Sequence, residues 1–446
     1  MRANPTVLTG WGRTRRAAMS AWRPERGPEL DDALAAIEGP VIARGAGRSY
    51  GDAAINDGGA AVMTTRLDRM LAFDPGSGEL VCEPGVTFRD LLDAFTARSF
   101  MPPASPGTAF ATVGGAVAAD VHGKNHDRHG SFGDAVRWIE LLLADGTTRR
   151  VSAAEDPELF RATIGGMGLT GIVRRIAVAM LPGAAPMVRV RERAVRDLDD
   201  HIAGLIEARA RSTFSVGWID ALATGAQLGR GVLETAEFAP GESPAPAPRR
   251  RAVPIDLPGF VLNTHAVRAF NTVYAARVPA SGREVLRRFD VFLYPLDAIH
   301  AWNRIYGKAG FYQFQCVIPD AEAPRAIRAM LERIAAAGSA SFLAVLKTLG
   351  REGRGLLSFP MPGITLALDF PRRPGVEALI GGLNRLAAEC GGRVYLAKDA
   401  LLTPGQFRAM YPQAEAFGAV LARVDPSGRF VSDLARRLAI RPGGGP

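Results

Sequence analysis

Two glycine-rich segments in the first 115 residues constrain the fold more than any other feature of the chain. Residues 43–52 read ARGAGRSYGD and follow an apolar run, 40–43, with the character of a strand. Residues 106–115, PGTAFATVGG, hold a second such loop. Glycine lets successive backbone N–H groups converge on an anion. Either loop alone would be interpreted as a turn, but two in one domain indicate a pyrophosphate held between them.

Turn and capping signals divide the first 181 residues into short strands and a few helices. Asp145-Gly146 marks one hairpin and residues 74–78 mark another, while Thr87 with Asp90 has the spacing of a capped helix start. The expected strands are 40–43, 70–73, 80–82, 136–143, 147–151 and 171–181, and the expected helices are 87–95 and 157–163. This pattern predicts an α+β fold, with strands packed against a few helices.

From about residue 187 the chain has longer predicted strands and helices than before. A chain of 446 residues favours two domains, and residues 182–186 have the proline content of a boundary. Residues 239–258 (APGESPAPAPRRRAVPIDLP) predict a mobile surface loop. Further expected elements are a helix at 324–337, strands at 342–347 and 363–370, and a capping box at 403–406, with proline at its first helical position and two helices in this tail.

Composition and charge exclude several classes of protein. The net charge of +9 favours anionic partners, although the arginines are scattered and only 249–251 form a run. No nucleic-acid-binding module is apparent, so no nucleic-acid partner is expected. The cysteines at 82, 316 and 390 have no CxxC spacing, which argues against disulfides and cysteine-bound metal.

The start of the chain and its apolar runs bear on location. No apolar run approaches the length of a membrane span. The N-terminus lacks the apolar region of a signal peptide, and Arg15-Arg16 fails as a twin-arginine signal for the same reason. We therefore expect a protein that is cytoplasmic, or peripheral at the inner membrane.

Three segments match nucleotide- or metal-binding motifs in sequence but lack the structural context that those motifs require. Residues 166–171 match GxGxxG, but a helix precedes them and a strand follows, the reverse of a dinucleotide fingerprint. Gly123-Lys124 lacks the earlier glycine and the Ser/Thr of a phosphate loop. His122, His126 and His129 have metal-ligand spacing only on a continuous helix, which the flanking glycines disfavour. No metal site is expected.

In combination, the motifs resemble a known family. The glycine-rich loops are similar to the flavin-binding domain of the vanillyl-alcohol-oxidase superfamily, and nearly the whole chain resembles the decaprenylphosphoryl-β-D-ribose 2′-oxidase family within it. The segments that carry the resemblance are 43–52, 106–126, GSFG (130–133), GGMGLTGI (165–172), SFPMPG (358–363), GGRVYLAKD (391–399) and MYP (410–412).

The resemblance implies a two-domain vanillyl-alcohol-oxidase-type fold with FAD as cofactor. The FAD-binding domain would span 1–185, an antiparallel-sheet substrate (cap) domain would span 186–392, and 393–446 would return to the FAD-binding domain. Residues matching FAD contacts are Ala43, Arg44, Gly45, Ala46, Gly47, Arg48, Ser49, Tyr50, Gly51, Asp52, Gly107, Thr112, Val113, Gly114, Gly115, His122, Gly123, Lys124, Asn125, Val173 and Tyr395. His126 and His129 would be structural or surface residues.

The resemblance also implies a reaction. The family oxidises the ribose 2′-hydroxyl of a polyprenyl-phosphoryl ribose, and an NAD(P)H-dependent short-chain reductase then completes epimerisation to the arabinose donor for cell-envelope glycans. Peripheral contact with a membrane would follow from such a lipid substrate. By matching position, the catalytic residues would be Lys398, Tyr50 and His122, and the substrate-binding residues would be Lys347, Gln313, Gln315, Trp218 and Lys124.

Four positions depart from the related patterns. Arg48 stands where sugar-alcohol and aldonolactone oxidases often carry the histidine that bonds to flavin, which predicts non-covalent FAD. Ala367 replaces an inhibitor-reactive cysteine, Thr365 an asparagine and Leu349 an aromatic residue, so the pocket differs from that of the best-known members. The alternatives are an FAD oxidase of a free sugar alcohol or aldonolactone, and a flavin-fold protein that binds glycolipid without turnover.

Overall fold

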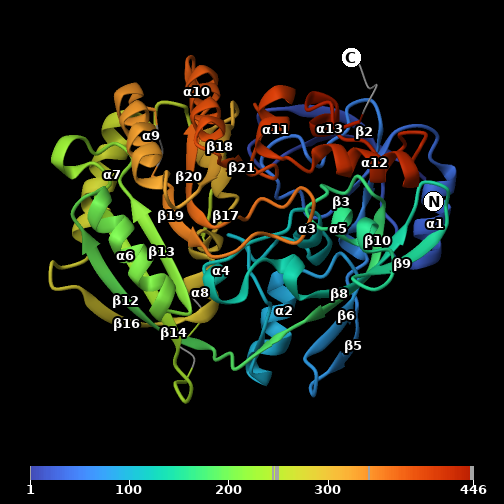
Figure 1. The fold of residues 1–446 in the computed structure, drawn as a ribbon, viewed down its shortest axis with the longest axis horizontal. Helices are drawn as coiled ribbons and strands as arrows, with labels where there is room; N and C mark the ends of the chain where they lie inside the picture. The colour runs from blue at the N-terminus through green and yellow to red at the C-terminus, as the bar shows by residue number, and fades with distance from the viewer. Residues whose placement is uncertain (1, 244–245, 247–250, 340–341, 442–446) are drawn as a thin grey trace.

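Three larger β-sheets, with helices packed against them, make up the protein (Figure 1). The computed structural model describes residues 2–243, 246, 251–339 and 342–441. Two of the sheets come from the first 182 residues and the third from residues beyond 186. The α+β class predicted from the sequence is confirmed. No helix in these described ranges combines the length and apolar character needed to cross a membrane.

The first sheet has the strand order β1-β2-β4-β3. Its strands are β1 (Asn4–Thr9), β2 (Arg16–Trp22), β3 (Val41–Arg44) and β4 (Ala60–Met63). Strands β2 and β3 run parallel to β4, and β3 ends where the first glycine-rich loop begins. Helix α1 (Gly27–Ala36) buries Leu30 and Leu34 against this sheet, because residues four apart lie on one face of a helix.

The second sheet contains both predicted hairpins. Its order is β5-β6-β10-β8-β9, with β5 (Met70–Asp74), β6 (Glu79–Cys82), β8 (Val136–Leu142), β9 (Thr148–Ser152) and β10 (Ile172–Ala179). Helix α2 (Phe88–Phe95) starts with the expected capping box, since Thr87 and Asp90 bond each other's backbone N–H groups. The predicted strand 171–181 is two strands, because Met180 separates β10 from β11 (Leu181–Pro182), which pairs with β7 (Phe100–Met101).

Short helices frame the glycine-rich segments. Helix α3 (Val113–Ala118) follows the second loop, and α4 (His126–His129) is a single turn. Helix α5 (Pro157–Thr163) precedes residues 166–171 and β10 follows them, which confirms that this GxGxxG is not a dinucleotide fingerprint.

The third sheet is antiparallel, with the strand order β16-β12-β14-β13-β19-β20-β18-β21. Its strands are β12 (Met187–Val195), β13 (Phe214–Ile219), β14 (Gly231–Phe238), β16 (Arg283–Arg288), β18 (Phe311–Ile318), β19 (Ala344–Leu349), β20 (Gly363–Pro371) and β21 (Arg393–Val394). Helices α6 (Leu198–Arg211), α9 (Ala323–Ala337) and α10 (Val376–Glu389) cover one face (Figure 1). The predicted strand at 342–347 begins two residues later, at Ala344.

The predicted proline-rich loop, 239–258, lies between β14 and α7 (Thr264–Ala276). Its residues 244, 245 and 247–250 lie outside the described ranges, so its mobility stays a prediction. Beyond them, β15 (Arg251–Ala252) pairs with β17 (Ile299–His300), and α8 (Phe289–Leu293) lies between α7 and β17 in the chain.

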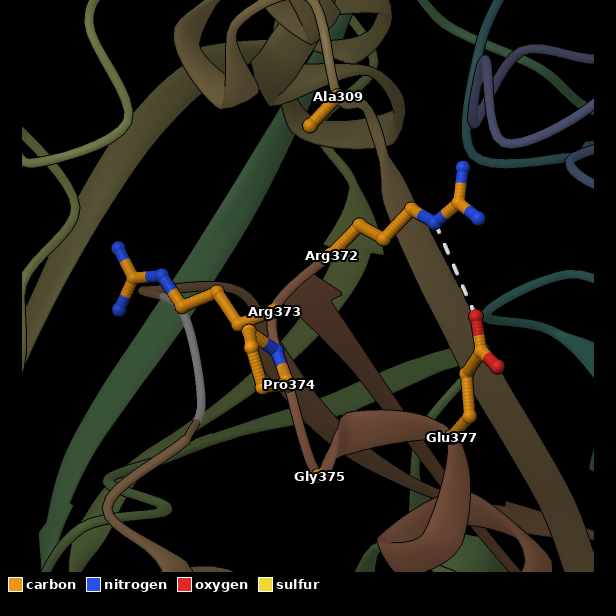
Figure 2. A pocket seen from close by; sticks show the side chains of 6 residues that line it. All are labelled: Ala309, Arg372, Arg373, Pro374, Gly375 and Glu377. Atoms are coloured by element: carbon orange, nitrogen blue, oxygen red, sulfur yellow. Dashed lines mark ion pairs between the residues drawn. The ribbon is translucent and has the colours of Figure 1, made fainter.

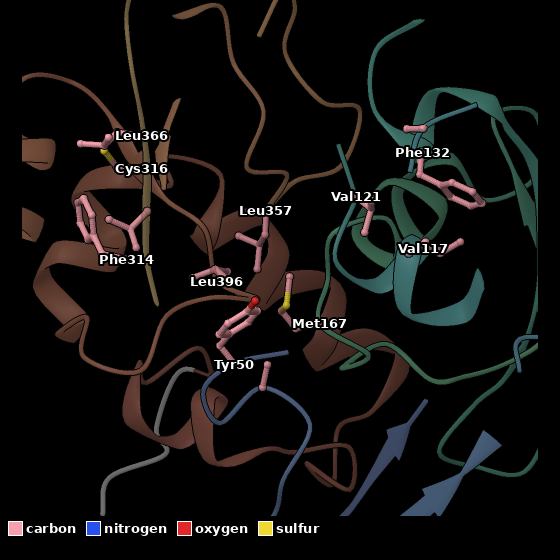
Figure 3. Close-up of a cluster of buried hydrophobic side chains, with 14 of the residues drawn as sticks. Tyr50, Val117, Val121, Phe132, Met167, Phe314, Cys316, Leu357, Leu366 and Leu396 are labelled. Atoms are coloured by element: carbon pink, nitrogen blue, oxygen red, sulfur yellow. The ribbon is translucent and has the colours of Figure 1, made fainter. Parts of the chain in front are cut away.

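The C-terminal segment packs against the first sheet. The capping box at Thr403 opens α11 (Pro404–Met410), and α12 (Ala414–Val424) and the short α13 (Asp433–Arg437) follow. Phe430 forms a bridge with Val41. The hydrophobic core runs through segments far apart in sequence, as Figure 3 illustrates with Tyr50, Leu357 and Leu396.

A buried ion pair fastens this segment to the first glycine-rich loop. The Arg437 guanidinium donates to both Asp52 carboxylate oxygens at 2.8 Å and lies 2.9 Å from Asp399 Oδ2. Both carboxylates are almost fully buried. Asp52 thus holds the loop through Arg437.

Arg437→Ala should lower the free energy of unfolding by about 3–5 kcal/mol, because it leaves two buried carboxylates unpaired. Arg211→Ala is the matched control, since its pair with Glu207 is exposed and should contribute about 0.5 kcal/mol or less. Urea unfolding of both variants in the same buffer measures the difference. Equal midpoints would contradict a fastening role for Arg437.

Candidate active site

One face of the eight-stranded sheet, opposite its helices, carries polar side chains. Directly paired residues of neighbouring strands point to the same face. Gln313 of β18 pairs with Asp369 of β20, and Lys347 of β19 pairs with Thr365 of β20. The residues aligned on this face are Trp218, Val345, Lys347, Thr365, Ala367, Asp369, Gln313 and Gln315.

His122 lies over this face and connects it to the first half of the chain. Its Nδ1 lies 3.3 Å from Lys347 Nζ, and its Nε2 lies 2.9 Å from the Gln315 amide. Gln315 also donates to Thr365 Oγ1 at 3.2 Å. Burial, and then the charge of Lys347, lower the pKa of His122 well below its usual value. His122 is therefore a neutral hydrogen-bonding group at neutral pH.

Lys398 and Tyr50 lie together at the end of this cluster. The Lys398 Nζ is 3.7 Å from the centre of the Tyr50 ring. The Tyr50 N–H donates to the Ala397 carbonyl at 2.9 Å, which holds the first glycine-rich loop against the segment that carries Lys398. Burial lowers the pKa of Lys398, and the neighbouring charge of Asp369 opposes that effect.

Asp369 is a member of the cluster that the sequence reasoning missed. It is fully buried, accepts from Gln313 Nε2 at 2.6 Å and from the Tyr306 hydroxyl at 3.0 Å, and its pKa is raised by burial. Gln313 also hydrogen-bonds Tyr50. The only local signal was an acidic residue in the apolar strand LALDFP, because buried carboxylates are rare without partners.

Two further lysines extend the positive charge along the site. Burial lowers the pKa of Lys347 to about 8, and the charge of Lys124 adds to this effect. Burial likewise lowers the pKa of Lys124 to about 8. Lys124 Nζ donates to the Phe292 carbonyl and lies 4.1 Å from the centre of that ring. Lys124, Lys347 and Lys398 thus form a cationic row suited to an anionic ligand.

Aromatic residues flank the row. Trp218 donates its indole N–H to the Phe342 carbonyl at 2.9 Å and packs on Tyr274, with ring centres 4.6 Å apart. Tyr395 stacks on Phe359, with centres 4.7 Å apart, and its hydroxyl donates to the Ala119 carbonyl. Because its hydroxyl is already hydrogen-bonded, Tyr395 would contact a ligand in the site through its ring.

The first glycine-rich loop has free backbone donors. Among the described residues, no acceptor is found for the N–H groups of Gly45 to Ser49. Arg44 braces the loop from below, donating to the carbonyls of Thr9 and Ala54. Gly47 has φ +64°, which glycine adopts without strain. A row of unpaired N–H groups fits the pyrophosphate of FAD.

The second loop packs against the first. A Cβ on Gly45 would come within 2.3 Å of Thr112 Oγ1, so the two loops touch. The N–H groups of Val113 and Gly114 donate to Val86 and Pro84 carbonyls, and that of Gly115 donates to Thr112. These three amides hold the loop in place and are not free to bind a phosphate. Gly107 borders open space instead.

The other expected site residues have structural surroundings. Asn125 donates to the Pro103 carbonyl, and Val173 lies on β10, opposite Leu141. Gly123 lies against Ser105, with no room for a side chain. His126 accepts from the Gly350 N–H, while His122 lies outside helix α4, so the three histidines share no helix face. The described residues contain no group of side chains arranged to hold a metal.

A surface pocket lies elsewhere on the protein. Figure 2 shows its lining, formed by Ala309, Arg372, Arg373, Pro374, Gly375 and Glu377. None of the candidate site residues belongs to it. Arg372 Nε is 3.7 Å from Glu377, so this pocket contains an ion pair already.

Comparisons with known proteins agree with this arrangement. A family model described as FAD binding domain matches residues 23–152, and one described as D-arabinono-1,4-lactone oxidase matches 367–438. The chain is 36% identical over 449 residues to decaprenylphosphoryl-beta-D-ribose oxidase of Mycolicibacterium smegmatis, covering 97% of each chain. It is 36% identical over 373 residues to an uncharacterized protein of Streptomyces coelicolor, covering 80% of this chain and 100% of that protein.

These findings define an FAD-dependent oxidoreductase with the two-domain vanillyl-alcohol-oxidase-type fold. The identity to the mycobacterial protein over nearly the full length further shows that the chain belongs to the decaprenylphosphoryl-β-D-ribose oxidase family. The expected enzyme class and the FAD cofactor are confirmed. The domain boundaries at 185 and 392 stay predictions.

Arg48 should leave FAD without a covalent bond to the protein. Its guanidinium carbon lies 4.1 Å from the Trp11 ring centre, and arginine is no practical nucleophile toward flavin. Precipitation with trichloroacetic acid should therefore release essentially all of the flavin into the supernatant, measured by its absorbance. Arg48→His provides a comparison at the same position. Flavin retained in the wild-type pellet would contradict the prediction.

Proposed function

We propose that this protein oxidises the ribose 2′-hydroxyl of a polyprenyl-phosphoryl-β-D-ribose to a 2′-keto sugar, the first half of epimerisation to an arabinose donor for cell-envelope glycans. The observation that carries the proposal is the cationic row of Lys124, Lys347 and Lys398 beside neutral His122. Such a row suits a substrate that joins a sugar to a phosphate. The relative from Mycolicibacterium smegmatis is named as an oxidase of such a molecule.

The proposed roles follow from the protonation states of the side chains. Bound FAD would supply the hydride acceptor. Burial lowers the pKa of Lys398, so this lysine reaches its uncharged form more readily than an exposed lysine. In that uncharged form it accepts the hydroxyl proton at Nζ and becomes cationic, so the proton stays with the protein. Tyr50 and Gln313 orient Lys398 and the sugar. Breaking the hydroxyl O–H bond and the C2′–H bond leaves the keto sugar.

Substrate binding is assigned to the remaining groups. Lys347 and Lys124, with pKa values near 8, carry positive charge at neutral pH and pair with the phosphate. His122 and Gln315 hydrogen-bond the pentose hydroxyls. Trp218 forms an apolar wall, and apolar surface favours the start of a prenyl chain.

The proposed epimerisation requires a partner enzyme. A 2′-keto sugar must be reduced to give the arabinose epimer, which calls for an NAD(P)H-dependent short-chain reductase. A lipid-linked substrate also favours work at the inner membrane surface, with the protein cytoplasmic or peripherally bound.

One observation favours a second candidate. The match of residues 367–438 to the D-arabinono-1,4-lactone oxidase model is consistent with an oxidase of a free aldonolactone or sugar alcohol. Dependence of turnover on the lipid-phosphate group separates the two candidates. The three-lysine row favours the phosphorylated substrate.

Mixing the purified protein anaerobically with a short-chain prenyl-phosphoryl ribose should bleach the oxidised-flavin absorbance rapidly. Lys398→Ala should slow the bleaching about 10²- to 10⁴-fold, because it removes the proton acceptor. Arg211→Ala is the control, since this arginine is exposed on helix α6, pairs with Glu207 and contacts none of the candidate residues. Bleaching by xylitol or a lactone, but not by the lipid-linked sugar, would transfer the assignment to a soluble sugar oxidase.

The pH dependence of the bleaching rate should depend on Asp369. The rate should rise with pH as Lys398 loses its proton, at a pH below the ordinary lysine value. The negative charge of Asp369 raises the pKa of Lys398, so Asp369→Asn should move the midpoint to lower pH, by about one unit. Stopped-flow absorbance across pH measures both midpoints.

Asp320→Asn is the matched control, because that carboxylate pairs with Arg209 and has no contact with Lys398. An Asp369→Asn midpoint that stays in place or moves to higher pH would contradict the assigned coupling.

A further inference from the structure

The face of the eight-stranded sheet that forms the candidate site carries a second charged cluster, beyond Trp218. Val216, two residues before Trp218, is directly paired with Glu234 of β14, and Glu234 is paired with Glu192 of β12. Directly paired residues point to the same face, as do residues two apart along a strand. The polar face of the site therefore continues across β14 and β12 toward the edge strand β16 (Figure 1).

Two arginines join these two glutamates. The Arg277 guanidinium donates to Glu192 Oε1 at 2.6 Å and to Glu234 Oε1 at 3.0 Å. The Arg287 guanidinium donates to Glu234 Oε1 at 3.0 Å and also to Glu192 Oε1. Arg283 donates to the other carboxylate oxygen of Glu192. We call these five residues the glutamate–arginine cluster.

Helix α7 joins the glutamate–arginine cluster to the aromatic wall of the site. Its Asn271 donates to Asp220 Oδ1 at 2.7 Å inside the protein. Arg277 caps the C-terminal end of the helix, and its guanidinium carbon lies 4.3 Å from the centre of the Tyr274 ring. Tyr274 packs in turn on Trp218, with ring centres 4.6 Å apart. The cluster and the candidate site therefore share a wall.

Stability alone does not account for a cluster of this kind. Glu192 is buried, and taking carboxylates and guanidinium groups out of water costs free energy that their attraction only partly returns. Replacing a buried ion network by apolar side chains of similar volume is often neutral for stability, or even stabilising. Charges retained beside a candidate site therefore favour a role toward a neighbouring group of that site.

Lys124 is the neighbouring group on which the cluster acts. The Ser215 N–H donates to the Lys124 carbonyl at 2.9 Å, and Ser215 directly precedes Val216, which is paired with Glu234. Burial lowers the pKa of Lys124 to about 8, the negative charge of Glu234 opposes this effect, and the positive charge of Arg287 adds to it. Two members of the cluster thus act on Lys124 with opposite sign.

The other charged groups around Lys124 do not replace Glu234. Lys347 of β19 is positive, and the charge of Lys124 lowers its pKa. His122, in the same loop as Lys124, has a pKa lowered by burial and is neutral. Asp290 of α8, the helix whose carbonyl accepts from Lys124 Nζ, is hydrogen-bonded to two arginines. Among the described residues, Glu234 is the carboxylate that raises the pKa of Lys124.

We propose that Glu234 and Arg287 are positioning residues, whose opposed charges set the charge on Lys124 and so determine the pH range over which the site holds a phosphodiester. Glu234 keeps the Lys124 ammonium group present at neutral pH, and Arg287, held by the same carboxylate, limits that effect. Both residues act through Lys124 rather than by touching the substrate. This role rests on the proposed function, in which Lys124 pairs with the phosphate.

The test measures binding of geranyl methyl phosphate to the FAD-loaded protein by titration calorimetry at a series of pH values. This phosphodiester carries no sugar and no hydroxyl group, so it cannot be oxidised in the proposed reaction, and its single negative charge stays constant from neutral to alkaline pH. Its affinity should fall as the lysines lose their protons, with a midpoint near pH 8, where Lys124 and Lys347 titrate.

The two cluster residues should move this midpoint in opposite directions. Glu234→Gln should lower it by about 0.5 to 1 pH unit, because Lys124 then loses its proton more readily. Arg287→Gln should raise it by about the same amount, whereas Arg287→Lys keeps the positive charge and should leave it in place. A merely structural role would weaken binding without opposite shifts. Should Glu234→Gln fail to fold, the two Arg287 variants decide the question.

Two matched controls lie on the opposite face of the same sheet. Glu284 follows Arg283 on β16, so it points away from the site, and it accepts from Arg189 at 2.9 Å and from Arg191 at 3.0 Å. Glu284→Gln and Arg189→Gln make the same changes of charge and should leave the midpoint in place. The flavin absorbance spectrum reports whether each variant remains folded and loaded with FAD.

Midpoints that stay in place, or that move in the same direction in Glu234→Gln and Arg287→Gln, would overturn the proposal. An undiminished shift on adding Glu234→Gln to Lys124→Met would overturn it as well, since the effect would then not pass through Lys124. The same holds if the wild type fails to bind the phosphodiester. Normal phosphodiester binding without flavin bleaching by the lipid-linked sugar would instead contradict the proposed oxidation alone.

Discussion

The site is arranged around three partly buried lysines. The negative charge close to them does not balance their positive charge. The charge of Lys124 lowers the pKa of Lys347, and that of Lys347 lowers the pKa of Lys398. The negative charge of Asp369 raises the pKa of Lys398, and Asp369 is itself buried. Holding like charges together costs free energy unless an anion joins them. The positive charge on these lysines therefore favours a negatively charged ligand.

That arrangement requires segments that lie far apart in the chain. The antiparallel register of β18, β19 and β20 aligns Gln313, Lys347 and Asp369 on one face. The glycine-rich loops bring His122 and Tyr50 to that face from the first sheets. Arg437 then joins the loop to the C-terminal segment that carries Lys398. The glycine-rich loops and the eight-stranded sheet are thus positioned by each other.

Local chemistry made part of this predictable from sequence. The turn at Asp145-Gly146, the capping boxes at Thr87 and Thr403, and the reversed order around residues 166–171 depend on neighbours in the chain, and the structure has them as expected. Asp369 depends on partners 56 and 63 residues away, which no local pattern reveals. Likewise, the sequence could not tell that distant carbonyls occupy the N–H groups of Val113 and Gly114.

The bond between Asn271 and Asp220 acts as a rotational stop for helix α7. Turning the helix about its axis would pull the Asn271 amide from Asp220 Oδ1, although this carboxylate would keep its ion pair with Arg230. The cost of losing the Asn271 bond therefore keeps Val267 and Asn271 facing the protein and fixes which residues of the helix face water.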